Sequence, residues 1–108
     1  MKSRIAHLAD GQFDASVAQG VTLVDFCAPW CEVCRTQDRI LTEVAEAAGG
    51  RASLATINAD GSDIAHRLGV HGMPTLLVFK DGKEVRRLVG VQKGEDLRAL
   101  LEWYLAHP

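Results

Sequence analysis

Hydrophobic and polar positions along the chain follow two periodicities, which together predict strands separated by helices. Five short runs rich in β-branched and other apolar residues predict strands: Ile5–Leu8, Val21–Phe26, Ala52–Asn58, Thr75–Phe79 and Glu84–Val89. Four segments with apolar residues at helical spacing predict helices: Gln12–Gln19 capped by Asp10, Cys31–Ala48, a short helix that begins at Asp60 or Ser62, and a last helix after Gly94.

The order of these segments predicts the fold class. The first strands are separated by helices, which implies parallel pairing with right-handed crossovers. Asp81-Gly82, between the last two strands, is a strong signal for a hairpin turn and so for antiparallel pairing. We therefore expect an α/β fold with a mixed central sheet and helices on both faces. The 108 residues suit one domain over 1–108.

Composition and charge exclude several functions. The apolar fraction of 47% is ordinary for a globular protein, and the net charge of −2 offers no case for nucleic acid or an anionic membrane. No apolar run follows the basic start at Met1–Arg4, and none is long enough to cross a bilayer. We expect a cytoplasmic protein.

The candidate chemistry is a pair of cysteines, Cys31 and Cys34, at the predicted start of the long helix. Unpaired N–H groups and the helix dipole there favour a thiolate at Cys31. Cys34 lies three residues further on the same helix face, and we expect it to be the more buried thiol. An exposed nucleophile with a buried partner suits thiol–disulfide exchange.

Two further residues belong to this candidate site. Asp25 places a carboxylate inside an apolar strand, where it needs a partner or a task, such as acting as general base for Cys34. The plain alternative is a partly solvated Asp near the strand end. Pro74 opens another strand, a position where proline is allowed, and composition alone does not indicate a cis bond.

The motifs together resemble the thioredoxin family over nearly the whole chain. Four segments carry the resemblance in family order: Asp25-Phe26-x-Ala28-Pro29-Trp30-Cys31-x-x-Cys34, Gly72-Met73-Pro74-Thr75, Phe79-Lys80-Asp81-Gly82 and Val89-Gly90. The resemblance implies a five-stranded mixed sheet with four helices, Cys31 as nucleophile, Cys34 as resolving thiol and Asp25 as buried proton acceptor.

The resemblance also implies how the protein works in the cell. It implies a cis proline at Pro74 and an apolar docking surface made of Trp30, Met73, Pro74, Gly90 and Val91. It implies a monomer that reduces protein disulfides, with thioredoxin reductase as electron donor and roles in electron transport and cell redox homeostasis. The Cys31–Cys34 pair would be the redox centre, with no other cofactor.

The sequence departs from the family at several positions. Glu32 and Val33 stand where relatives usually carry Gly-Pro, and we expect them to shift the redox potential, towards a less reducing value if anything. Thr56 stands where relatives often have a lysine near the Asp, so we predict a strongly raised pKa for Asp25. Cys27 replaces an aromatic residue and falls on the Asp25 side of its strand.

Three alternatives remain open from the sequence. Cys27 is a small buried hydrophobe, or else a third redox or metal-binding thiol. The spacing of the three cysteines also occurs in proteins that hold a [4Fe–4S] cluster, and zinc would need a ligand from His7, His66, His71 or His107. A non-catalytic docking module would use the fold alone.

Overall fold

Five strands form one mixed sheet whose spatial order is β1-β3-β2-β4-β5 in this computed structural model, which describes residues 5–107. The strands are β1 (Ala6–Leu8), β2 (Val21–Cys27), β3 (Ser53–Asn58), β4 (Thr75–Lys80) and β5 (Lys83–Val89). The helices are the 3₁₀ turn η1 (Asp10–Gln12), α1 (Phe13–Val17), α2 (Glu32–Ala48), α3 (Asp63–Arg67) and α4 (Gly94–Ala106). The predicted fold class is confirmed.

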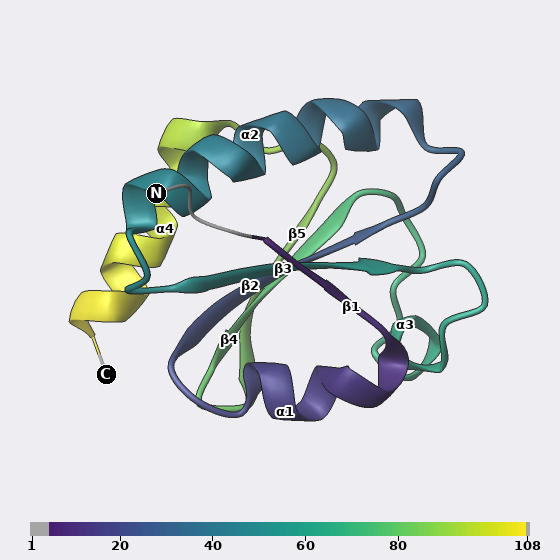
Figure 1. Cartoon of the computed structure of the whole chain (residues 1–108), viewed down its shortest axis with the longest axis horizontal. Coiled ribbons are helices and arrows are strands. Elements are labelled where there is room, and N and C mark those ends of the chain that lie inside the picture. Colours follow the sequence, from purple (N-terminus) through teal and green to yellow (C-terminus); the bar gives the residue numbers. More distant parts are fainter. Residues whose placement is uncertain (1–4, 108) are drawn as a thin grey trace.

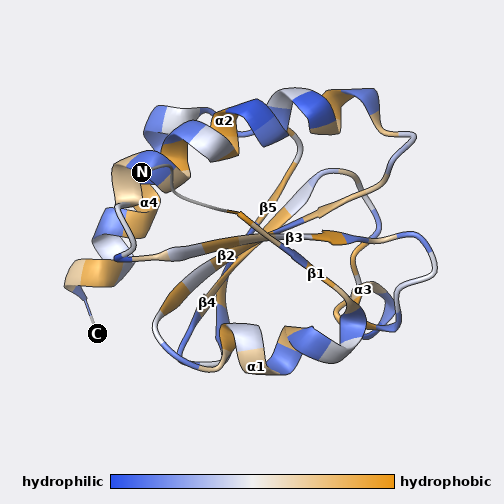
Figure 2. Cartoon of the chain, viewed as in Figure 1, coloured by the Kyte–Doolittle hydropathy of each residue, from blue (hydrophilic) through white to orange (hydrophobic). Residues whose placement is uncertain are grey.

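The helices cover both faces of the sheet, with α2 and α4 on one side and α1 and α3 on the other (Figure 1). The central strand β2 pairs in parallel with β3 and antiparallel with β4. Figure 2 shows that polar and apolar residues alternate along α2. Such a helix can turn its apolar residues towards the sheet and its polar residues towards solvent. Among residues 5–107, no helix combines the length and the apolar character needed to cross a bilayer.

Alternate residues of β2 face different halves of the core. Val21 and Leu23 pack into the cluster under α2 and α4, whereas Val24 and Phe26 pack into the cluster under α1 and α3. Since side chains alternate along a strand, Asp25 belongs with Leu23 on the α2 side. A short loop over residues 28–31 joins the end of β2 to α2, so Asp25 lies on the face of the sheet that the cysteine-bearing helix covers.

The role predicted for Asp10 is wrong. Asp10 lies within η1 rather than capping the first helix, and its carboxylate accepts hydrogen bonds from the Ser62 hydroxyl at 2.7 Å and the Asp63 N–H at 2.7 Å. Ser62 is the N-cap of α3 and accepts from the Ala65 N–H at 3.1 Å. Asp10 therefore supports the start of α3, a long-range contact that local sequence patterns do not reveal.

This double cap yields a stability prediction. Ser62→Ala removes the acceptor for Ala65 and a donor to Asp10, so we expect a loss of about 1–2 kcal/mol in the free energy of unfolding. Urea denaturation measures it, with the exposed Ser53→Ala as matched control. Equal effects of the two substitutions would show that the cap contributes nothing.

Candidate active site

The two cysteines lie at the junction between β2 and α2. Cys31 is the N-cap of α2, with extended backbone angles of φ −85° and ψ 105°. Its N–H donates to the Ala28 carbonyl at 3.0 Å, and its own carbonyl accepts from the Cys34 N–H at 3.2 Å. The predicted helix start was one residue early, but Cys31 does stand at the positive end of the helix.

Both cysteines are buried. Cys34 is 3% exposed, and Cys31 is 6% exposed, which differs from the exposed thiol that we expected. Ala28 and Met73 pack against the pair and cover it. The Cys31 side chain is therefore recessed among its neighbours and does not project from the surface. All three cysteines are thiols in this structure.

Burial makes the Cys34 thiol hard to ionise. It raises the pKa of Cys34 to about 11, and the Cys31 thiol, which lies within hydrogen-bonding reach, also disfavours ionisation. With that pKa, only about one Cys34 in ten thousand is ionised at neutral pH. A nucleophilic role for this thiol therefore needs a nearby group that accepts its proton.

Asp25 is such a group. Its side chain is completely buried in the middle of the sheet, where its register neighbours are Thr56 on β3 and Leu76 on β4. Neither neighbour carries a charge. Burial raises the pKa of Asp25 to about 7, as expected from the absence of a lysine at position 56. A carboxyl that titrates near neutral pH is suited to accept and return protons.

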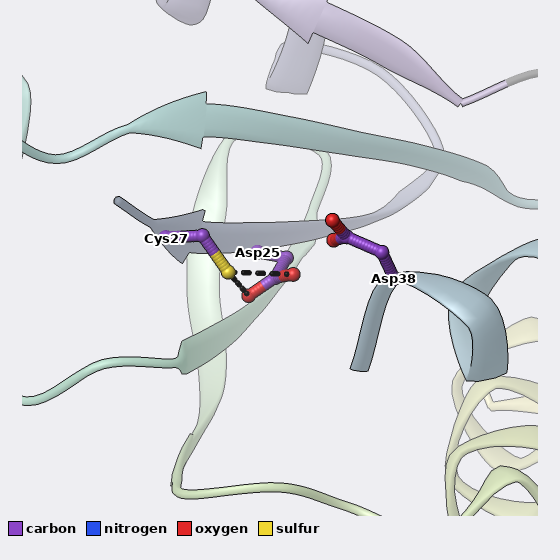
Figure 3. A group of neighbouring side chains, drawn as sticks. All are labelled: Asp25, Cys27 and Asp38. Carbon is purple, nitrogen blue, oxygen red and sulfur yellow. Dashed lines mark hydrogen bonds between the residues drawn. The ribbon is translucent and has the colours of Figure 1, made fainter. Parts of the chain in front are cut away.

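Cys27 contacts this carboxylate directly. Its thiol donates to Asp25, with the sulfur 3.2 Å from Oδ1 and 3.1 Å from Oδ2 (Figure 3). The predicted placement on the Asp25 side of the strand is therefore confirmed. Burial, the Cys34 thiol and the Asp25 charge raise the pKa of Cys27 far above its ordinary range, so this thiol keeps its proton.

Asp38 and His7 also belong to this environment, although sequence reasoning did not place them here. Asp38 lies on α2, and its negative charge adds to the raised pKa of Asp25. The ring of His7 on β1 hydrogen-bonds the Thr56 hydroxyl at 2.7 Å. Burial raises the pKa of Asp38, and the nearby His7 partly offsets that rise. The spacing of Asp38, four residues after Cys34, could have revealed it, because such residues share a helix face.

A cavity of about 430 Å³ opens beside these residues and has His7, Cys27, Asp38 and Thr56 among its lining residues. Single ligand atoms of Asp25, Cys27 and Asp38 all lie within 4.8 Å of one another. Zinc in structural sites takes four ligands, mainly nitrogen and sulfur. Two carboxylates with a single thiol that already donates to one of them do not match that set.

The docking residues expected from the sequence differ in their contacts with the cysteines and in their exposure. Met73 packs against the cysteine cluster, and the bond from Met73 to Pro74 is cis. The Gly90 N–H donates to the Pro74 carbonyl at 2.8 Å, which joins two of the predicted segments, and Val91 is 42% exposed. Trp30 is 68% exposed, so the side chains of Trp30 and Val91 are both accessible to a partner.

Two contacts around this surface were not foreseen. The Trp30 indole N–H donates to the Asp60 carboxylate at 2.8 Å, which orients the ring. Gln37 is fully buried on α2, where its side chain donates to the Gln92 carbonyl at 3.1 Å and accepts from the Gln92 N–H at 2.6 Å. A polar residue within the apolar stripe of a helix is the signal that could have indicated this tie.

Glu32 and Val33 occupy the first turn of α2 between the cysteines. Both are exposed, with Val33 at 52%. Glu32 therefore brings a negative charge, and Val33 an apolar side chain, to the surface that a substrate would meet beside Trp30. Neither restricts the backbone in the way that proline would.

Known proteins resemble this chain in sequence and in fold. The family model described as Thioredoxin matches residues 4–103. Thioredoxins from Staphylococcus saprophyticus and Staphylococcus aureus strain Mu50 are 37% and 38% identical over 102 residues, covering 94% of this chain and 98% of each relative. A mutant thioredoxin from Halobacterium salinarum NRC-1 superposes with a TM-score of 0.85 at 31% identity, covering 94% of this chain and 91% of that one.

A thioredoxin from Malassezia sympodialis also shares the fold, with a TM-score of 0.83, 25% identity and coverage of 96% and 93% of the two chains. Family model, relatives and fold agree with the site geometry, in which a paired thiol stands at a helix start beside a buried carboxylate. The chain therefore belongs to the thioredoxin family of thiol–disulfide oxidoreductases.

Proposed function

We propose that Cys31 is the nucleophile of a protein-disulfide reductase, that Cys34 is the resolving thiol and that Asp25 accepts the proton of Cys34. The observation that carries this proposal is the placement of Cys31 at the N-terminus of α2, one turn before a buried Cys34. The helix terminus stabilises negative charge at Cys31. The buried partner stays protonated until a base acts on it.

The reaction runs in two exchange steps. The Cys31 thiolate attacks a substrate disulfide, which forms a mixed disulfide and releases one substrate sulfur as a thiolate. Cys34 then loses its proton and attacks the Cys31 sulfur, so that the Cys31–Cys34 disulfide forms and the second substrate thiolate leaves. The protein gives two electrons to the substrate, and the cysteine pair is the only redox group the reaction needs.

The surface around Cys31 supports an extended peptide as substrate. Trp30 and Val91 offer exposed apolar area, while Met73 packs against the cysteine cluster and carries the backbone of this segment past it. An extended segment would pair with that backbone as an added strand and place its disulfide over Cys31. The recessed position of Cys31 means that the substrate sulfur has to enter between these residues.

The cellular setting follows from the family. We propose that a thioredoxin reductase returns the Cys31–Cys34 pair to the dithiol, that the protein acts as a monomer in the cytoplasm, and that it serves electron transport and redox homeostasis. The exposed Glu32 and Val33 lie where that reductase would dock, and they are the positions most able to alter its recognition.

The first prediction about function concerns activity. With NADPH and a thioredoxin reductase, or with dithiothreitol as reductant, the protein will reduce insulin disulfides, and Cys31→Ser will abolish the reaction because no nucleophile remains. Cys34→Ser will accumulate a mixed disulfide, visible by mass spectrometry as a mass increase that dithiothreitol removes. A Cys31→Ser variant as active as the unmodified protein would refute the assignment.

A second prediction follows from the raised pKa of Asp25, about 7 in the folded chain against an ordinary value of 3.8. The folded state holds this proton more tightly than the unfolded state, so stability falls as pH rises through that window and then levels off. A gap of about three pH units corresponds to about 4 kcal/mol above neutral pH.

Asp25→Asn removes this ionisation. We expect the variant to exceed the wild type in free energy of unfolding by up to about 4 kcal/mol at about pH 8.5, and to differ little at about pH 4. Urea denaturation across pH measures the difference, with the exposed Glu46→Gln as control. A difference between Asp25→Asn and wild type that does not depend on pH would contradict the raised pKa.

The third prediction concerns the residues between the cysteines. Replacing Glu32-Val33 by Gly-Pro presets the start of α2. We expect this to outweigh the loss of the Glu32 charge, which by itself would stabilise the Cys31 thiolate and so the dithiol. We expect the Gly-Pro variant to be the more reducing protein when both are equilibrated with glutathione buffers and the dithiol fraction is measured by alkylation. Identical dithiol fractions in the unmodified protein and the Gly-Pro variant would show that Glu32 and Val33 do not tune the redox potential.

A further inference from the structure

The proton path from Cys34 to Asp25 has a third member. Burial is the largest influence on the pKa of Asp25 and on that of Cys34, and Cys27 is the next largest influence on each. Its thiol donates to both oxygens of Asp25 at 3.2 and 3.1 Å, and it packs against the cluster that contains Cys34. Cys27 therefore contacts the buried carboxylate and also packs against the cluster that holds the resolving thiol.

We propose, on the basis of the function proposed above, that Cys27 is a catalytic proton relay that carries the proton of Cys34 to Asp25. As Cys34 attacks the Cys31 sulfur of the mixed disulfide, its proton passes to the sulfur of Cys27, and the proton of Cys27 passes to Asp25. The Cys31–Cys34 bond forms, the bond from Cys31 to the substrate breaks, and the substrate sulfur leaves with the electron pair. Cys27 ends as it began, as a thiol.

The properties of Cys27 suit a relay and not a third redox centre. Burial and the neighbouring Asp25 keep the thiol protonated, and only a thiolate acts as nucleophile in disulfide exchange. A protonated thiol can donate to a carboxylate on one side and accept from a thiol on the other. The relay is a further role for Cys27, beside the alternatives that the sequence left open, and it needs the proton of this thiol.

Among the described residues, the Cys27 thiol is the side chain that hydrogen-bonds Asp25, and an oxygen of Asp38 lies within 4.8 Å of both groups. From β3 and β4 it meets Thr56 and Leu76, neither of which is ionisable. From α2 the charge of Asp38 makes Asp25 more basic. His7 on β1 bonds Thr56 rather than Asp25. The cavity lined by Cys27, His7 and Asp38 gives the relay contact with solvent, through which the proton can leave between turnovers.

The test separates the two exchange steps with the small disulfide 5,5′-dithiobis(2-nitrobenzoate). Attack by Cys31 releases one coloured thiolate, and attack by Cys34 releases the second, so stopped-flow absorbance reports both rates. Cys27→Ser keeps a group that donates and accepts protons, whereas Cys27→Val removes it. Both variants lack the third thiol, which makes them a matched pair.

We expect the first release to be equal in the two variants and the second to be slower in Cys27→Val by about a hundredfold at neutral pH, the low end of general-base contributions. The slow step should quicken as pH rises, because hydroxide then removes the Cys34 proton. Asp25→Asn should show the same loss, and Asp25→Asn combined with Cys27→Val should be no slower than either alone.

Equal second-step rates in Cys27→Val and Cys27→Ser, or losses that multiply in the double variant, would overturn the relay. Loss of the relay leaves the first release intact, whereas failure of the proposed function would appear as a first release that Cys31→Ser does not abolish. The two failures are therefore distinguishable.

A second measurement avoids the Cys27 substitutions in case Cys27→Val does not fold. In a Cys31→Ser/Cys34→Ser background the only S–H stretching band in the infrared belongs to Cys27. We expect this band to lie at lower frequency above pH 7, where Asp25 is ionised, than below it, and to lose that pH dependence in Asp25→Asn. If the frequency of this band changes neither with pH nor with Asp25→Asn, the hydrogen bond from Cys27 to Asp25, on which the relay depends, is contradicted.

Discussion

The burial of one carboxylate without a compensating cation determines the chemistry of this site. Asp25 lies in the central strand of the sheet between Thr56 and Leu76, and the group that contacts it is the Cys27 thiol. A thiol donates a weaker hydrogen bond than an ammonium group and carries no charge. The carboxyl therefore binds its proton near neutral pH, where a base for Cys34 is most useful.

The burial of Asp25 affects both the stability of the fold and the proposed transfer of the Cys34 proton. Burying an ionisable group without a cation lowers stability at and above neutral pH, yet the same burial makes Asp25 basic enough to take the proton of Cys34. Asp38 strengthens that effect by adding negative charge from α2. Cys31 stands at the N-terminus of α2, one turn before the buried Cys34, and this difference in position underlies the different tasks proposed for the two cysteines.

The sequence was sufficient for the fold and for the main residues of the site. Short apolar runs and the Asp81-Gly82 turn predicted the strands, and strand alternation placed Cys27 beside Asp25. The partner of Asp10 was not predictable, because Ser62 lies 52 residues away in sequence. The recessed position of Cys31 also escaped prediction, since it depends on the loop that carries Met73.

The most direct test of this account is the titration of the Asp25 carboxyl in the reduced protein, followed by carbon NMR with Asp25→Asn to assign the resonance. The account predicts a midpoint close to 7, with a higher midpoint in Cys27→Val because a hydrogen bond to the ionised form is lost. A midpoint close to the ordinary 3.8 would contradict it, because Asp25 would then be too weak a base to take the proton of Cys34.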